Sequence, residues 1–254
     1  MGYADKIFDL TGKVVVVTGG SRGLGRQIAT AVARQGADVV IASRKLPACE
    51  DAANEIKNET GRETMAYAVH VGRWDELEPF VDVVYDRFGR VDVLFNNAGM
   101  SPVYDKLTDV TEKLFDSVVN LNFKGPFRLA ALIGERMYAA GKGSIINVSS
   151  SGSIRPKAKI VPYAGAKAAL NAMSEGLAEG LGPRVRVNTL MPGTFQTDVS
   201  KAWDFDAVAE DRKQHTALRR VGQPPEIIGA ALFLASDASS YTSGTIIRVD
   251  GGMF

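Results

Sequence analysis

Two residues near the middle of the chain have the types and the spacing that proton transfer requires. Tyr163 and Lys167 lie four residues apart at the start of a helical pattern, so they share one helix face. At ~4 Å and an effective dielectric of ~20, an ammonium would stabilise the phenolate by about 4 kcal/mol. That would lower the tyrosine pKa from about 10 towards 7. The pair is weak as a motif alone, but it predicts a general acid/base.

A second motif, near the N-terminus, has the form of a phosphate-binding turn. The β-branched run Val14–Val17 leads into glycines spaced G-x-x-x-G-x-G, and a helical pattern follows at once. Glycine lets the chain turn sharply and lets backbone N–H groups approach a pyrophosphate at a helix N-terminus. The turn residues expected to bind a dinucleotide are Gly19, Ser21, Arg22, Gly23, Leu24 and Gly25.

The end of the next expected strand distinguishes between the two nicotinamide dinucleotides. An NAD site usually carries Asp or Glu here, to accept from the ribose 2′-OH. No acid occurs between Ile41 and Leu46; the segment contains Ser43 and Arg44, and Arg22 lies in the glycine turn. A guanidinium suits a 2′-phosphate, which a carboxylate would repel. We therefore predict NADP(H), with NAD(H) as the less favoured cofactor.

The elements that must position these residues follow from the hydrophobic pattern. Short continuous β-branched runs alternate with helical patterns, which is typical of parallel strands buried on both faces. We predict an α/β fold: a Rossmann-type, doubly wound parallel sheet of about seven strands with helices on both faces, in one domain over 1–254. Strands are expected at Val14–Val17, Val39–Ile41, Thr64–Val69, Val91–Phe95, Ile145–Val148, Val185–Leu190 and Thr245–Val249. Helices are expected at Gly25–Gln35, Pro47–Thr60, Asp75–Phe88, Thr111–Ala140, Tyr163–Leu181 and Pro225–Ala235.

One segment interrupts this alternation. Residues 194–221 contain Trp203, Phe205 and many charged residues, without a clear strand. A long insertion after the carboxyl end of a strand is a candidate substrate lid. A surface helical excursion without a gating role is the alternative interpretation, and the pattern alone favours neither.

The composition argues against several classes of partner and site. The formal net charge is +1 and 23% of residues are charged, so nothing indicates nucleic-acid or membrane-surface binding. One cysteine and two histidines exclude an internal disulfide and disfavour a metal site. The sequence has no signal-peptide pattern and no apolar run of membrane-spanning length. We therefore expect a cytoplasmic protein that acts on a small molecule.

Together these motifs resemble those of the short-chain dehydrogenase/reductase family. Besides the glycine turn, Tyr163 and Lys167, the matching residues are Asn96-Asn97-Ala98-Gly99, Ser150, Asn188, Pro192-Gly193, Thr197 and Val249-Asp250-Gly251-Gly252. The resemblance covers essentially the whole chain. It implies hydride transfer between a nicotinamide and a ketone or secondary alcohol.

The resemblance also implies individual roles. Tyr163 resembles the proton donor or acceptor, and Lys167 the residue that holds the nicotinamide ribose and tunes the tyrosine. Ser150 would hydrogen-bond the substrate oxygen as charge develops, and Asn122 would anchor a water for proton relay. Further cofactor contacts are implied for His70, Val71, Asn96, Ala98, Gly99, Pro192, Gly193 and Thr197.

His70 departs from the family pattern. Members commonly have an aspartate here, near the adenine amino group, whereas this chain has His70-Val71. An imidazole also accepts a hydrogen bond, and its titration near a pKa of about 6.5 would make cofactor affinity pH-dependent. A partly exposed histidine without a role is the alternative.

Two other functions stay open beside a small-molecule oxidoreductase. One is a 3-oxoacyl carrier-protein or acyl-CoA reductase, in which surface arginines at two positions hold an acidic carrier. Arg128 matches the first position, but Glu179 stands at the second and would repel the carrier. A non-catalytic NADP(H) sensor or scaffold is the other, although it has no need for the four catalytic residues. The resemblance implies a homotetramer. These motifs specify neither the substrate nor the physiological direction.

Overall fold

The computed structural model describes residues 2–197 and 205–254, which contain one sheet of seven parallel strands. The strand order is β3-β2-β1-β4-β5-β6-β7, so the chain changes direction across the sheet between β1 and β4. Ligands bind at such a switch point in open α/β sheets. The predicted doubly wound α/β fold is confirmed. The strands are β1 (Val14–Thr18), β2 (Asp38–Ser43), β3 (Thr64–Ala68), β4 (Val93–Asn96), β5 (Gly143–Val148), β6 (Val185–Pro192) and β7 (Ile246–Val249).

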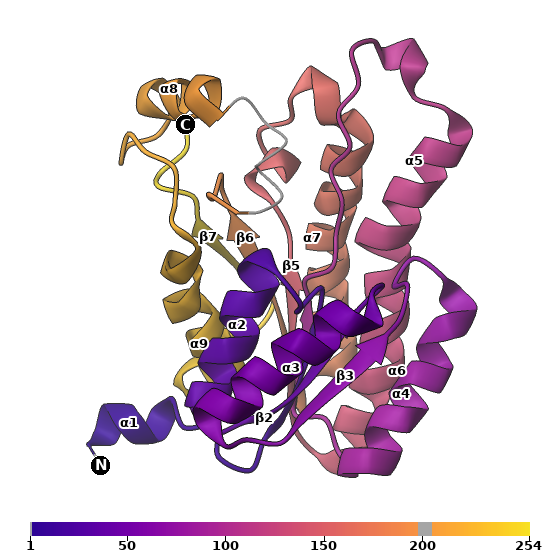
Figure 1. Cartoon of the computed structure of the whole chain (residues 1–254), viewed down its shortest axis with the longest axis vertical. Coiled ribbons are helices and arrows are strands. Elements are labelled where there is room, and N and C mark those ends of the chain that lie inside the picture. The colour runs from indigo at the N-terminus through magenta and orange to yellow at the C-terminus, as the bar shows by residue number, and fades with distance from the viewer. Residues whose placement is uncertain (1, 198–204) are drawn as a thin grey trace.

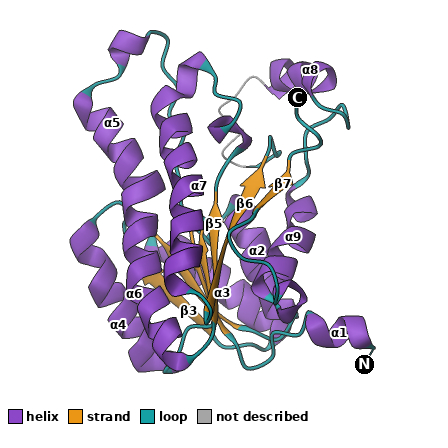
Figure 2. Ribbon diagram, turned by 180° about the vertical axis from the view of Figure 1, so that it is seen from behind, coloured by secondary structure: helices purple, strands orange, loops and turns teal. Residues whose placement is uncertain are grey.

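Helices cover both faces of this sheet (Figure 2). The bounds of the α-helices are α1 (Tyr3–Ile7), α2 (Gly23–Arg34), α3 (Leu46–Thr60), α4 (Trp74–Phe88), α5 (Glu112–Val119), α6 (Gly125–Ala140), α7 (Val161–Leu181), α8 (Phe205–His215) and α9 (Ile228–Ala235). Helices α2, α3 and α9 pack on one face, and α4, α6 and α7 on the other. Strand β1 shows why: all its residues are buried, and Val15 and Val17 join one core while Val14 and Val16 join the other.

The long helix predicted over Thr111–Ala140 is not one regular α-helix. Helix α5 ends at Val119, a π-helical turn occupies Asn120–Lys124, and α6 starts at Gly125. Pro126 has no N–H and so cannot donate the hydrogen bond that an α-helix needs at that point. Gly125 also packs tightly, because a Cβ there would lie 2.0 Å from the Val71 carbonyl oxygen. Such π-turns are frequent at functional sites.

Part of the segment 194–221 is helical. Helix α8 lies over the carboxyl ends of β6 and β7 (Figure 1). Its C-terminal end is tied to the end of the chain by an isolated bridge between Thr216 and Met253. Trp203, which belongs to this segment, falls outside the described residues.

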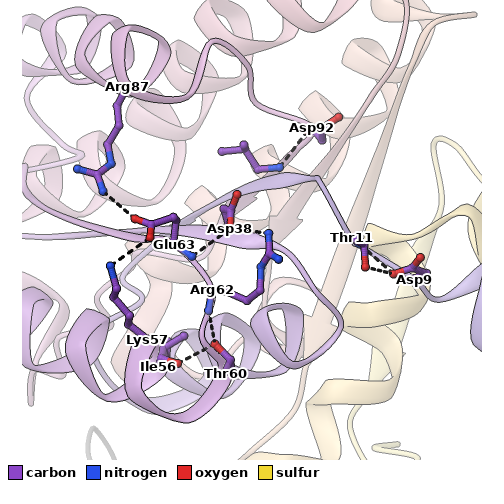
Figure 3. A network of polar contacts seen from close by, with 11 residues as sticks. Asp9, Thr11, Asp38, Ile56, Lys57, Thr60, Arg62, Glu63, Arg87 and Asp92 are labelled. Atoms are coloured by element: carbon purple, nitrogen blue, oxygen red, sulfur yellow. Dashed lines mark hydrogen bonds and ion pairs between the residues drawn. The ribbon is translucent and has the colours of Figure 1, made fainter.

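The amino ends of β2 and β3 carry a network of charged side chains (Figure 3). Asp38 accepts from Arg62 at 2.7 Å, and Glu63 pairs with Lys57 at 3.1 Å and Arg87 at 3.4 Å. These contacts link α3, α4 and the two strands at the edge opposite to the carboxyl ends. Ion pairs this exposed contribute little to stability, so the buried core supplies most of it.

Phe80 gives a direct test of that core. It is fully buried in α4, with its ring 5.0 Å from the ring of Tyr67. Phe80→Ala should lower the free energy of unfolding by about 3–5 kcal/mol, because it removes a large side chain and leaves a cavity. Val83→Ala, at a position on the same helix that is 41% exposed, should change it by less than about 1 kcal/mol. Urea denaturation measures both; equal losses would contradict the assignment of the core.

Candidate active site

A cavity of about 700 Å³ lies at the carboxyl ends of the strands. Its wall is built from the loops that follow β1 to β6, together with α7 and α8. This is where ligands bind in doubly wound sheets. The sequence-predicted residues that line it are Gly19, Ser21, Arg22, Gly23, Leu24, Gly25, Ser43, Arg44, Val71, Ala98, Gly99, Ser150, Tyr163, Lys167, Pro192, Gly193 and Thr197.

The glycine turn is shaped by backbone conformation and by close packing. Gly19 and Gly23 have φ angles of +66° and +58°, which side chains rarely adopt. A Cβ on Gly25 would lie 2.3 Å from the Gly19 carbonyl oxygen. The turn therefore needs glycine at these positions, and it leaves the N-terminus of α2 accessible from the cavity.

The loop after β4 is fixed to this turn by Thr18, a residue that the sequence analysis does not single out. Its Oγ1 accepts from the backbone N–H groups of Asn97 and Ala98, each at 3.0 Å, and donates to the Phe95 carbonyl at 3.2 Å. The Asn97 amide donates to the Thr18 carbonyl at 2.9 Å. The only sequence signal for this role was a threonine directly after the predicted strand Val14–Val17.

Ser150 and Tyr163 face each other across Gly152. A Cβ on Gly152 would lie 3.4 Å from Ser150 Oγ and 3.8 Å from the Tyr163 ring. Ser150 Oγ accepts from the Gly152 N–H at 3.1 Å, and the Ser150 carbonyl accepts from Ser153 Oγ at 2.7 Å. Both hydroxyls thus lie on one side of the cavity, where they can reach one substrate oxygen.

Lys167 lies behind Tyr163, one turn further along α7. Only 3% of its surface is exposed, and its Nζ donates to the Val148 carbonyl at 2.7 Å. Asn122 approaches the same place from the π-helical turn. A Cβ on Gly99 would lie 2.8 Å from Asn122 Oδ1 and 3.6 Å from Lys167 Nζ. The structure therefore brings together the four residues that the resemblance marks as catalytic.

Comparison with known proteins identifies the family. A family model described as enoyl-(acyl carrier protein) reductase matches residues 19–254. The chain is 37% identical to the Chlamydia trachomatis 3-oxoacyl-[acyl-carrier-protein] reductase FabG, over 96% of this chain and 98% of the relative. The chain belongs to the short-chain dehydrogenase/reductase family.

Other family members differ in activity and cofactor. The NAD-dependent glycerol dehydrogenase of Listeria innocua is 34% identical, over 98% of this chain and 96% of the relative. The structure of a gluconate 5-dehydrogenase from Burkholderia cenocepacia, in complex with NADP and tartrate, has a TM-score of 0.93 and 31% identity, covering 98% of each chain. This dehydrogenase/reductase is thus an oxidoreductase of alcohol or ketone groups on small molecules, with an NAD(P)-binding Rossmann fold.

The end of the cavity formed by the loops after β1 and β2 carries cations and hydroxyls. Arg22, Arg44 and Lys45 line it, and the Ser43 hydroxyl lies 3.0 Å from both Ser21 Oγ and Cys49 Sγ. Among the described residues no Asp or Glu lines the cavity. Cations and hydroxyls without a carboxylate can hold a phosphate monoester on the ribose.

Asn96 does not have the expected place in the cavity wall. Its side chain is buried, and its Nδ2 donates to Asn147 Oδ1 at 2.9 Å and to the Pro126 carbonyl at 3.2 Å. The strand pleat explains this: Asn96 is the last residue of β4 and points into the fold, whereas Asn97 leaves the strand and lines the cavity. Asn96 therefore packs β4 against β5 and α6.

His70 also lies outside the cavity wall. Its ring Nδ1 accepts from the Gly72 N–H at 3.1 Å, and its own backbone N–H donates to Glu76 at 2.8 Å. The ring thus stabilises the turn before α4. Val71, the next residue, is the one that lines the cavity.

The expected lowering of the Tyr163 pKa by Lys167 is wrong for this structure. Burial raises the pKa of Tyr163, with the Ser150 hydroxyl acting in the opposite direction. Burial also lowers the pKa of Lys167 to about 7. Lys167 Nζ lies 6.0 Å from the centre of the Tyr163 ring and donates to the Val148 carbonyl. A cation that loses its own charge to burial stabilises a phenolate only weakly.

Three further residues of the cavity wall, Thr194, Phe195 and Arg212, belong to the predicted lid segment 194–221. The described wall residues that were not predicted from the sequence are Lys45, Ala48, Val69, Asn97, Met100, Ser101, Val103, Leu121, Val148, Ser149, Arg155, Lys157, Ile160 and Met253. Most come from loops whose shape the motifs do not encode.

Within residues 2–197 and 205–254, no helix is both long and apolar enough to cross a membrane.

Burial of Lys167 predicts a pH-dependent stability. Its pKa is about 7 in the folded chain and about 10.4 when unfolded. Between these values the unfolded state binds more protons, so the free energy of unfolding rises with pH, by at most about 1.4 kcal/mol per pH unit. Lys167→Met removes the group and should flatten the profile between pH 7 and 9 in urea titrations.

The control is Lys113→Met, at an exposed position outside the cavity, which should keep the wild-type slope. A Lys167→Met profile as steep as that of the wild type would show that another group sets the pH dependence.

Proposed function

We propose that this dehydrogenase/reductase reduces the ketone of a small molecule with NADPH, and that Tyr163 is its acid. The observation that carries the proposal is the placement of the Ser150 and Tyr163 hydroxyls beside one another in the cavity, with Lys167 and Asn122 behind them. The nicotinamide supplies the hydride when it is bound. The same residues serve the reverse oxidation of a secondary alcohol.

The chemistry of the protein side follows from these positions. Ser150 and Tyr163 hydrogen-bond the carbonyl oxygen and stabilise the negative charge that develops there. Tyr163 then donates its proton to that oxygen. Burial raises the pKa of Tyr163, so the phenol is protonated at neutral pH and has a proton to donate. Lys167 and Asn122, on the inner side, are placed to return a proton to the phenolate.

Replacing the phenol hydroxyl tests this role. Tyr163→Phe should lower kcat for ketone reduction by at least about 100-fold, because it removes the acid. NADPH affinity, measured by fluorescence titration, should change little. Tyr138→Phe, on α6 and outside the cavity wall, should match the wild type. Turnover that survives in Tyr163→Phe would refute the mechanism, and a wild type that binds NADPH but turns over no ketone would favour the sensor alternative.

The preference for NADP(H) rests on charge. Arg22, Arg44 and Lys45 line the adenosine end, and no acid occurs between Ile41 and Leu46. One relative of known structure is in complex with NADP, and another relative is NAD-dependent, so the preference depends on these side chains rather than on the family.

Arg44 is the residue that tests the preference. Arg44→Ala should raise the NADPH dissociation constant by about 10- to 100-fold, since charge-assisted hydrogen bonds contribute about 1.5–3 kcal/mol. NADH binding should stay the same, because NADH has no 2′-phosphate. Arg73→Ala, at an exposed position paired with Glu76, is the matched control. A wild type that binds NADH as tightly as NADPH would contradict the proposed preference for NADP(H).

A carrier-bound substrate is less well supported than a small molecule. Arg128, which matches a carrier-holding position, already pairs with Glu78 at 2.7 Å and lies 4.7 Å above the Trp74 ring. Glu179 is exposed and would repel an acidic carrier. A free ketone or secondary alcohol needs neither residue.

We also propose one catalytic domain over 1–254, a substrate lid at 194–221 and a cytoplasmic homotetramer. The lid is supported by α8, which carries Arg212 into the cavity wall. Exposed apolar side chains such as Phe115 on α5 and Phe127 on α6 support association through these helices. The single cysteine fits a reducing compartment.

A further inference from the structure

The charge of the cavity wall exceeds what the cofactor requires. Among the described residues, the wall contains seven cationic side chains and no carboxylate. They are Arg22, Arg44, Lys45, Arg155, Lys157, Lys167 and Arg212. A cleft lined by one sign of charge concentrates ligands of the opposite sign.

Apart from Lys167, which is buried on α7, these cations fall into two groups of three. The residues after β1 and β2 face the expected adenosine phosphate. Arg155, Lys157 and Arg212 instead come from the loop after β5 and from α8, over β6 and β7 (Figure 1). The β5 loop also carries Ser150, and the Arg155 N–H donates to the Ser151 carbonyl at 2.9 Å. Arg155 and Lys157 therefore lie on the same loop as Ser150, and Arg212 lines the same cavity.

Arg212 is the most telling member of this group. Only 5% of its surface is exposed, although a guanidinium is rarely buried unless its hydrogen bonds are satisfied. Asp211 pairs with one Nη, and the other Nη has only the weak thioether acceptor of Met253, at 3.4 Å. The buried Nε has no hydrogen-bond partner in the described part of the chain. Arg212 lines the cavity, and within the described residues one of its Nη groups has only this thioether as acceptor.

We propose that Arg212, with Arg155 and Lys157, binds a carboxylate of the substrate. The substrate class is then a keto acid, or the hydroxy acid in the reverse direction, with its anionic group directed towards α8 and its carbonyl towards Ser150 and Tyr163. This specificity rests on the proposed function. A planar guanidinium whose donors are not all used within the described residues matches a carboxylate in geometry as well as in charge.

The experiment compares keto acids of four to six carbons with their primary amides, which are similar in shape but uncharged. The wild type should prefer the acid by at least tenfold in kcat/KM. In Arg212→Met, KM for the acid should rise by about 10- to 100-fold, with the amide and NADPH affinity unchanged. Lys213→Met, which alters the exposed neighbour on the same helix, should behave as the wild type.

Calorimetric titration with tartrate, on protein loaded with NADP, gives a readout without turnover. The wild type should bind tartrate, and Arg212→Met should bind it at least tenfold more weakly. If no ketone is reduced but this loss is seen, the carboxylate site stands and the proposed reduction fails. If Arg212→Met does not fold, the double variant with Arg155→Met and Lys157→Met, both at exposed positions, should lose the preference for acids.

Two results would overturn the proposal. Equal kcat/KM for acids and amides in the wild type, without tartrate binding, would show that the cavity does not select an anion. A loss of NADPH affinity in Arg212→Met, with the preference for acids intact, would assign the guanidinium to the cofactor pyrophosphate instead.

Discussion

Three hydrogen bonds of the Thr18 hydroxyl fix the loop after β4 against the end of β1. A hydroxyl can donate one hydrogen bond and accept two, and Thr18 uses all three, with the Phe95 carbonyl and the N–H groups of Asn97 and Ala98. These bonds join the loops that follow β1 and β4, where the strand order turns. The tight contact of Gly25 with Gly19 depends on the same clamp, because the Asn97 amide lies against both glycines. The cofactor cleft is shaped by this clamp before any ligand enters.

Burial, rather than the pairing of charges, sets the resting state of the catalytic side chains. The expected attraction between an ammonium and a phenolate assumes that both charges are present. In the cavity, desolvation disfavours both, so the pKa of Tyr163 rises and that of Lys167 falls. The neutral phenol is the form that can give a proton to a ketone. The two side chains thus rest as a neutral phenol and a largely neutral amine, without an ion pair between them.

The sequence predicts the parts of the fold that depend on burial of whole segments. Continuous β-branched runs such as Val14–Val17 identify strands because both faces of the sheet are covered, and all seven were placed to within a few residues. The break at Asn120–Lys124 was missed, because it depends on Pro126 and on the close approach of Gly125 to Val71. Periodicity carries no signal for such a local rearrangement.

Side-chain direction at the site was harder to predict than membership of the motifs. Asn96 and Asn97 belong to one motif, but the pleat turns only the second towards the cavity. Arg212 lies in a segment without a recognisable pattern, and only the tertiary position of α8 brings it to the wall. Contacts made between distant segments leave no local trace in the sequence.

The excess of cations in the cavity also affects how this protein is handled in the laboratory. Phosphate, sulfate and citrate are small anions that suit guanidinium groups. In such buffers these anions would bind beside Arg44 and Arg212 in the cavity. There they would compete with the cofactor phosphate at the first position and with the substrate carboxylate at the second. Salt at 0.1 M, with a Debye length of about 10 Å, would further screen the approach of anions from outside. A zwitterionic buffer at low ionic strength leaves the charge of the cleft available to its own ligands.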